Sequence, residues 1–272
     1  MPDTGTDPPG KRRVLPTALA LSLLAVFAGP PALGADGRPG IIGKDDRVPL
    51  TAEGPPWDAV GQVNIGGFRT SGQCTGTLVA PRMVVTAAHC VINPATGRPH
   101  PLNDTHFLAA VRGSDHKGHA TARCLRFAHG HALAEPDGTA ALPPDDKVPL
   151  TALAADAAVI VLNADLEVAP APVADGASAS PGSRLTHVAY PSDRRFLPVV
   201  HQGCLLIRAD PNSPFWLNDC DTIPGSSGGP ILVDDGGTYK VAAIQVAAGS
   251  SGANVALPLP VWSDLIRDTG CP

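Results

Sequence analysis

The stretch DTIPGSSGGP, residues 221–230, places Ser227 in a glycine-rich loop that is followed by an apolar run. A serine hydroxyl is a poor nucleophile at neutral pH until a histidine removes its proton. That histidine in turn needs a carboxylate, which fixes its tautomer and stabilises its cationic form. Nucleophilic chemistry at Ser227 therefore requires that the fold bring a histidine and an aspartate or glutamate to this loop.

Gly225, Ser227 and Gly229 match the G-x-S-x-G pattern of a nucleophile elbow, in which the serine lies between a strand and a helix. In proteins with that elbow the histidine follows the serine, yet the last histidine of this chain, His201, precedes it. The residues after Pro230 read ILV and predict a strand where the elbow needs a helix. The elbow interpretation is therefore rejected.

His89, in TAAHC, and Asp156, in LAADAAVIVL, are the best candidates for the base and its carboxylate. Asp156 precedes an apolar run that predicts a buried strand, so its side chain would be buried and aimed at the imidazole. Other aspartates between His89 and Ser227 are flanked by turn or polar residues and are interpreted as surface charges: Asp145, Asp146, Asp165 and Asp175.

The motifs TAAHC, CTGTLVAP and GSSGGP, in the order His, Asp, Ser, resemble those of the trypsin-chymotrypsin family. The resemblance implies a serine endopeptidase that cuts proteins or peptides through an acyl-enzyme and needs no cofactor or metal. It also implies an all-β fold of two antiparallel six-stranded barrels with a short C-terminal helix. His89, Asp156 and Ser227 would lie between the barrels, with the N–H groups of Gly225 and Ser227 as the oxyanion hole. A catalytically silent binding module of the same fold is the alternative.

The loop DTIPGSSG and the start IIGKDDR resemble most the bacterial glutamyl-endopeptidase-like branch of that family. In the pancreatic enzymes an aspartate before the nucleophile pairs with a newly cut N-terminus, whereas this chain has Ser226 there. The resemblance therefore does not extend to pancreatic activation chemistry.

The resemblance also assigns residues to the substrate pocket. Asp221 stands where trypsin-like enzymes place an acid at the bottom of the pocket, which would favour Arg or Lys substrates. Gln245 stands where the glutamyl-endopeptidase-like branch carries a histidine, which argues against acidic substrates. Val246 and Ala247 would narrow the pocket wall, so small apolar side chains are the second choice.

Composition limits the partners and the type of fold. The chain has 272 residues with 20 Lys and Arg against 25 Asp and Glu, a net charge of -5, which predicts no nucleic-acid partner. The 29 glycines and 30 prolines favour short strands joined by turns over long helices. Only VWSDLIRD, near the end, has helical spacing.

The first 35 residues read as a secretory signal. Lys11, Arg12 and Arg13 precede an apolar run over 14–28 and then small residues, and the run is too short to span a bilayer. We therefore expect a secreted protein, extracellular or periplasmic, with no membrane contact once the signal is removed. We also expect it to be a monomer. Residues 36–40 form a possible short propeptide, and 41–272 the protease domain, with the boundary between barrels at roughly 150–185.

The six cysteines of an exported chain predict disulfides, and no C-x-x-C pair favours a metal site. Six cysteines allow 15 pairings. Cys74 with Cys90 and Cys204 with Cys220 would close two short loops, and Cys124 would then pair with Cys271 by default.

The polar region 92–149 contains scattered histidines, among them an H-x-x-H at His116 and His119 and an H-x-H at His129 and His131. Such spacing can hold a metal ion, but no carboxylate partner is identifiable, so these histidines are interpreted as solvated loop residues.

Overall fold

The computed structural model describes residues 1–2, 38–67, 72–131, 150–175, 179–249, 252–267 and 270–271. The chain divides into two units, residues 1–30 and 31–272, and all the described strands and helices belong to the second unit. The predicted signal at 1–35 lies outside the described residues apart from residues 1 and 2.

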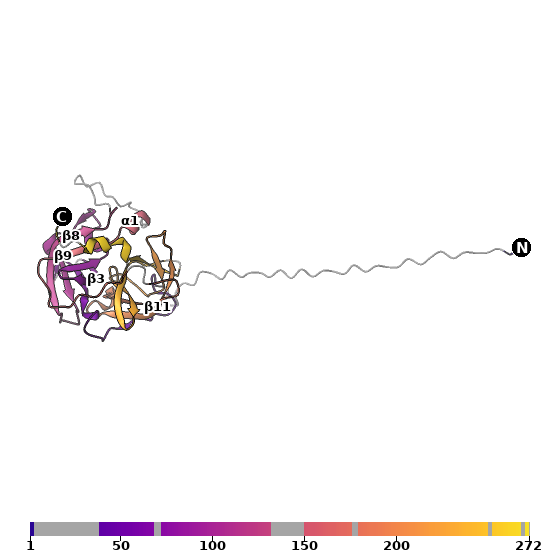
Figure 1. Ribbon diagram of the computed structural model, residues 1–272, viewed down its shortest axis with the longest axis horizontal. Coiled ribbons are helices and arrows are strands. Elements are labelled where there is room, and N and C mark those ends of the chain that lie inside the picture. Colours follow the sequence, from indigo (N-terminus) through magenta and orange to yellow (C-terminus); the bar gives the residue numbers. More distant parts are fainter. Residues whose placement is uncertain are drawn as a thin grey trace. The chain divides into compact units, whose positions relative to one another are not determined.

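The first half of the described chain forms a closed antiparallel barrel in the order β2-β3-β4-β9-β8-β7. Figure 1 shows two of these strands, β8 and β9, side by side. The six strands are β2 (Val60–Ile65), β3 (Gly72–Ala80), β4 (Met83–Thr86), β7 (Thr105–Ala109), β8 (Gly118–Phe127) and β9 (Ala158–Leu162).

The second half forms a second antiparallel barrel in the order β11-β10-β13-β14-β15-β12, closed by the pairing of β12 with β11. Its strands are β10 (Arg184–Ala189), β11 (Val199–Ala209), β12 (Trp216–Asn218), β13 (Pro230–Asp235), β14 (Thr238–Ala247) and β15 (Asn254–Pro258). The predicted architecture of two six-stranded antiparallel barrels is therefore confirmed.

Short elements connect and cover the strands. A two-stranded sheet pairs β5 (Ile92–Asn93) with β6 (Arg98–Pro99), and the one described α-helix is α1 (Leu150–Ala154). The 3-10 helices are η1 (Trp57–Ala59), η3 (Ala88–Cys90), η4 (Leu102–Asp104), η5 (Ser192–Arg194), η6 (Leu259–Val261) and η7 (Ser263–Ile266). Among the described residues, no helix has the length and the apolar character needed to cross a membrane.

The C-terminal segment differs in detail from the expected α-helix. It forms the two 3-10 turns η6 and η7, the first with Pro260 in its first turn. In η7 the backbone hydrogen bonds run to the third residue before, from Leu265 N–H to Trp262 O and from Arg267 N–H to Asp264 O, which is the tighter 3-10 pattern.

Apolar side chains fill both barrels because alternate residues of each strand point inward. In the first barrel Phe107 and Ile160 are fully buried, and in the second Leu206 and Ile231 are. Gly76 is needed inside the first barrel, since a Cβ there would lie 2.7 Å from a methyl of Val84.

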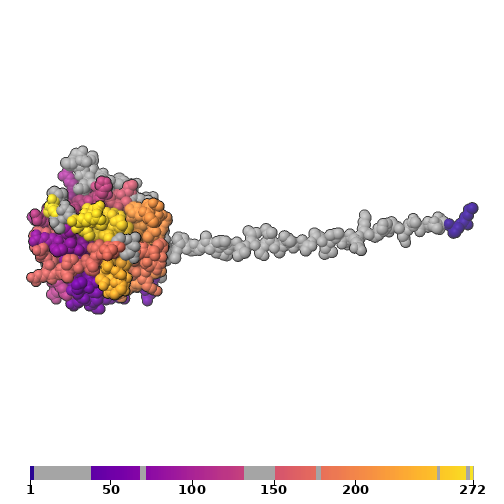
Figure 2. Space-filling view, viewed as in Figure 1, coloured from indigo at the N-terminus to yellow at the C-terminus, as the bar shows by residue number. Residues whose placement is uncertain are grey.

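Each end of the domain crosses to the other barrel. The N-terminal strand β1 (Val48–Pro49) pairs with β11 of the second barrel. The C-terminal segment is tied to the first barrel by the Cys124–Cys271 disulfide and by a hydrogen bond of 2.7 Å from Arg126 to the carbonyl of Leu265. Figure 2 shows these C-terminal residues, in yellow, on the surface beside segments from the middle of the chain.

Candidate active site

His89 and Asp156 meet at the end of the first barrel. His89 lies in η3, directly after β4, and Asp156 lies between α1 and β9, which pairs with β4. One carboxylate oxygen of Asp156 is 2.6 Å from His89 Nδ1, and the other accepts the backbone N–H of His89 at 2.8 Å. Both oxygens therefore orient the same residue, and a proton on Nδ1 leaves Nε2 free to accept another.

The electrostatics of this pair favour a charged imidazole. Burial lowers the pKa of His89, but the charge of Asp156 and its hydrogen bond raise it, and the net shift is upward from the usual value. The His89 side chain is 46% exposed, so water offsets much of the cost of burial. Asp156, by contrast, is buried, and its charge therefore acts at short range with little screening.

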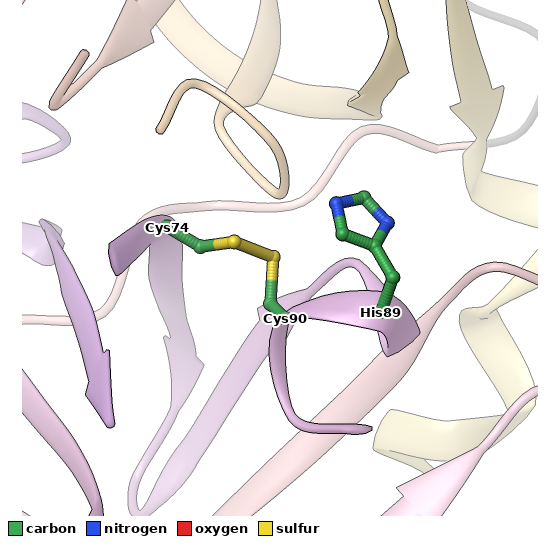
Figure 3. Close-up of side chains that lie close together, drawn as sticks. All are labelled: Cys74, His89 and Cys90. Atoms are coloured by element: carbon green, nitrogen blue, oxygen red, sulfur yellow. A yellow bond between two sulfur atoms is a disulfide. The ribbon is translucent and has the colours of Figure 1, made fainter. Parts of the chain in front are cut away.

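A disulfide fixes the segment that carries His89. Cys90 is the neighbour of His89 in η3 and bonds to Cys74 of β3, with a Cα–Cα distance of 5.9 Å. Figure 3 shows this disulfide next to the imidazole. Cys74, His89 and Cys90 also form a group with metal-ligand atoms, but the two sulfurs are bonded to each other and carry no thiolate.

Ser227 lies in the loop between β12 and β13 of the second barrel, and hydrogen bonds fasten this loop to the first barrel. The Ser227 carbonyl accepts the N–H of Thr75 in β3 at 2.9 Å. At Gly228, where φ is +78°, a Cβ would lie 2.2 Å from the hydroxyl oxygen of Thr86 at the end of β4. The loop therefore approaches β3 and β4 so closely that a residue with a Cβ would not fit at position 228.

The predicted oxyanion-hole residues have backbones suited to that role. Gly225 has φ +94°, and a Cβ there would lie 2.7 Å from the carbonyl oxygen of Tyr190, so glycine is required. Among the described residues, the N–H groups of Gly225 and Ser227 have no hydrogen-bond partner, whereas Ser226 N–H donates to Ile223 O. Two free donors thus flank the Ser227 side chain.

Ser227 Oγ forms no hydrogen bond with His89 among the described residues. Such contacts are often long in a site without substrate and tighten in the complex. The arrangement brings together the base, its carboxylate and the serine loop through Thr75 and the disulfide.

Asp221 has a different environment from the one expected. Its side chain is fully buried, and its two oxygens accept the backbone N–H groups of Ile42 and Asp46 at 2.9 and 2.8 Å. Its own N–H donates to His201 Nδ1 at 2.9 Å. Burial raises the pKa of the Asp221 carboxyl, opposed by these two N–H donors. This placement argues against a role for Asp221 in binding a basic substrate side chain, because both oxygens already accept N–H groups of the N-terminal segment.

The remaining predicted pocket residues lie on β14. Gln245 is buried, and its side chain accepts from Asn218 at 3.2 Å and donates to the carbonyl of Ala247 at 3.0 Å. Its backbone also bonds to Gly228 and Gly229 of the serine loop. Val246 is buried and Ala247 half-buried. Gln245 therefore borders the serine loop.

Sequence reasoning missed two residues that organise the site. Thr75 also donates its hydroxyl to the Gly225 carbonyl at 2.9 Å and accepts the N–H of Tyr190 at 2.9 Å. Its place in the CTGT motif was the available signal. Asn254 donates to the carbonyls of Gly40 and Cys220, each at 2.8 Å, and no sequence pattern marks it.

A family model for the trypsin-like peptidase domain matches residues 74–239, more than half of the chain, and this range includes His89, Asp156 and Ser227. The chain belongs to this family. The family prediction is thus confirmed, and as a member of the trypsin-like peptidases the chain is a serine endopeptidase. A comparison with curated protein sequences finds no match.

Solved protease structures share the fold of this trypsin-like peptidase. Glu endopeptidase has a TM-score of 0.63 and 20% identity, over 80% of this chain and 93% of that one. The VesB protease of Vibrio cholerae has 0.60 and 18%, over 81% and 66%. The protease Anisep from Arthrobacter nicotinovorans has 0.58 and 19%, over 82% and 100%. At these identities the likeness concerns the fold.

Proposed function

We propose that this trypsin-like peptidase is an exported endopeptidase in which Ser227 is the nucleophile, His89 the general base and Asp156 the residue that orients it. The observation that carries the proposal is the double contact of Asp156 with His89, beside a serine loop that is bonded to β3.

In the proposed mechanism His89 Nε2 takes the proton of Ser227 Oγ as the oxygen attacks a peptide carbonyl. The Gly225 and Ser227 N–H groups donate to the developing oxyanion. The imidazolium then gives its proton to the leaving amine, and Asp156 stabilises the cation meanwhile. Water repeats the sequence on the acyl-enzyme and releases the second product.

Export is supported by the signal-like residues 1–35 and by three disulfides, which persist in oxidising compartments. We propose a secreted monomer that acts on proteins or peptides, and 36–40 as a short propeptide. For the residue before the scissile bond we now propose a small apolar preference. Both oxygens of Asp221 already accept backbone N–H groups of the N-terminal segment. The other predicted pocket residues, Gln245, Val246 and Ala247, are uncharged.

The test is covalent labelling of the purified protein by a fluorophosphonate probe. We expect Ser227→Ala to abolish labelling and to lower peptide turnover by several orders of magnitude, roughly 10⁶-fold in kcat. The neighbouring variant Ser226→Ala should retain labelling. An unlabelled wild type would favour the silent binding module, and labelling of Ser227→Ala at the wild-type level would rule out Ser227 as nucleophile.

A further inference from the structure

Three histidines that are scattered in the sequence meet on the outside of the first barrel. His106 Nδ1 lies 2.8 Å from His119 Nε2, with the ring centroids 5.1 Å apart and the ring planes at 12° to each other. The ring of His116 lies edge-on to His119, with centroids 6.1 Å apart. This histidine cluster, His106, His116 and His119, is separate from the residues of the proposed catalytic mechanism.

The register between β7 and β8 explains why His106 and His119 lie close together. In β7 the buried residues alternate with more exposed ones, so His106 points outward between Thr105 and Phe107. His119 likewise points outward next to buried Ala120 of β8. Because His106 pairs with Thr121 and Leu108 with His119, the two histidines are diagonal neighbours on one face.

The spacing of the two nitrogens suits a shared metal ion. Imidazole nitrogens bind Zn²⁺ at about 2.0–2.1 Å, so two ligands lie about 2.8–3.0 Å apart at right angles and about 3.3–3.4 Å apart at tetrahedral angles. The observed 2.8 Å matches the first arrangement and would open by about 0.5 Å for the second, with the rings tilting so that both nitrogens face the ion. Proximity without a metal requires that one ring hold the proton between the nitrogens.

We propose that the histidine cluster binds a divalent transition-metal ion of the kind that prefers imidazole, such as Zn²⁺, Ni²⁺ or Cu²⁺. His106 Nδ1 and His119 Nε2 are the two preformed ligands, and His116 is the third, reached by a change of side-chain rotamer. On binding, the proton between the rings moves to the outer nitrogen of its own ring, so that both ligands are neutral imidazoles.

One further observation agrees with this site. A Cβ at Gly67 would lie 3.1 Å from His106 Nε2, so the glycine leaves room for the ring in its present orientation.

The test uses the full secreted chain after dialysis against a chelator, titrated with Zn²⁺ alone by calorimetry and with Co²⁺ alone by visible absorption. We expect one equivalent to bind. Loss of a residue that only orients a ligand costs about 10- to 100-fold in metal affinity, so His106→Ala and His119→Ala should each cost at least as much. The exposed His129→Ala is the matched control and should bind like the wild type.

His89, the proposed catalytic base, could compete with the histidine cluster for the added metal ion, since its side chain is partly exposed. Binding that is unchanged in both His106→Ala and His119→Ala would place the ion elsewhere and overturn the proposal, as would a wild type that binds no metal. Fluorophosphonate labelling of Ser227 checks that each variant is folded. If a variant fails to fold, NMR of the wild type decides, because Zn²⁺ must shift the ring signals of His106 and His119.

Discussion

At the scale of single residues, the base and its carboxylate form a unit held by two contacts. Asp156 uses one oxygen on the ring and one on the backbone of His89, so it fixes both the tautomer and the place of the imidazole. The same contact raises the pKa of His89 above its usual value. Only the neutral imidazole can take the serine proton, so the shift sets the acid limit of activity.

We therefore expect activity to fall as the pH drops through a value above about 6.5, the ordinary histidine pKa. Asp156→Asn removes the negative charge that raises the pKa of His89, while the burial that lowers this pKa remains. The acid midpoint of activity should therefore move to lower pH, and kcat should fall about 10⁴-fold. The measurement is a pH profile of kcat/KM, with Asp165→Asn, an exposed surface variant, as control. An unchanged acid midpoint in Asp156→Asn would show that Asp156 does not set the His89 pKa.

A second histidine is buried without a full set of partners. His187 in β10 has its Nδ1 3.2 Å from the carbonyl of Pro230, and its Nε2 has no hydrogen-bond partner among the described residues. Burial lowers the pKa of His187 to about 4, aided by the nearby His201 and by the positive charge of Arg47. The folded state therefore holds a neutral ring where the unfolded chain, with a pKa of about 6.5, binds a proton.

The stability linked to His187 is present above pH 6.5 and is lost as the pH falls toward 4, by up to about 3 kcal/mol. We expect His187→Asn, which keeps a donor toward Pro230, to be less stable at pH 7 but to lose less further stability between pH 6.5 and 4. Denaturant unfolding at each pH measures this, with exposed His129→Asn as control. Equal acid sensitivity in wild type and His187→Asn would contradict the assignment.

At the scale of elements, the N-terminal segment is docked by backbone groups. Asp221 accepts from Ile42 and Asp46, and Asn254 donates to Gly40. The Arg47 side chain is buried and lies 3.0 Å from Asp193, in η5. The contacts hold the segment against the residues that precede the serine loop. This role for Asp221 is structural and does not depend on the substrate.

Asp221→Ala should remove the acceptor of two partly buried N–H groups, and because hydrogen bonds to charged groups contribute about 1.5–3 kcal/mol each, it should lower the free energy of unfolding by roughly 3 kcal/mol. The peptide-library preference of the folded fraction should stay as in the wild type. Asp175→Ala, whose side chain is fully exposed, is the control and should change neither quantity. Loss of cleavage after Arg or Lys in Asp221→Ala would restore Asp221 to the pocket.

At the scale of the whole domain, the ends of the chain link the two barrels. Cys124 and Cys271 are 147 residues apart in sequence, against 16 for each of the other two pairs. In the chain-entropy model the long closure stabilises the fold by about 5 kcal/mol and each short one by about 3 kcal/mol.

The double variant Cys124→Ser with Cys271→Ser should therefore lower Tm by roughly 10–20 °C. The double variant Cys204→Ser with Cys220→Ser should lower Tm by less. Thermal unfolding measures both, and fluorophosphonate labelling at 25 °C shows whether the site persists. A smaller decrease in Tm on removal of the Cys124–Cys271 disulfide than on removal of the Cys204–Cys220 disulfide would contradict the chain-entropy explanation.

The sequence by itself determined the features that depend on neighbouring residues. Turn residues and short apolar runs predicted the strands, and the family motifs around His89 and Ser227 marked the candidate site, because local spacing carries both kinds of information. The side-chain direction of Asp221 and the contacts of Asn254 needed the tertiary structure, since their partners near residue 40 are far away in sequence. The meeting of His106 with His119 depended on the register between β7 and β8, and a shift of one residue would have separated them.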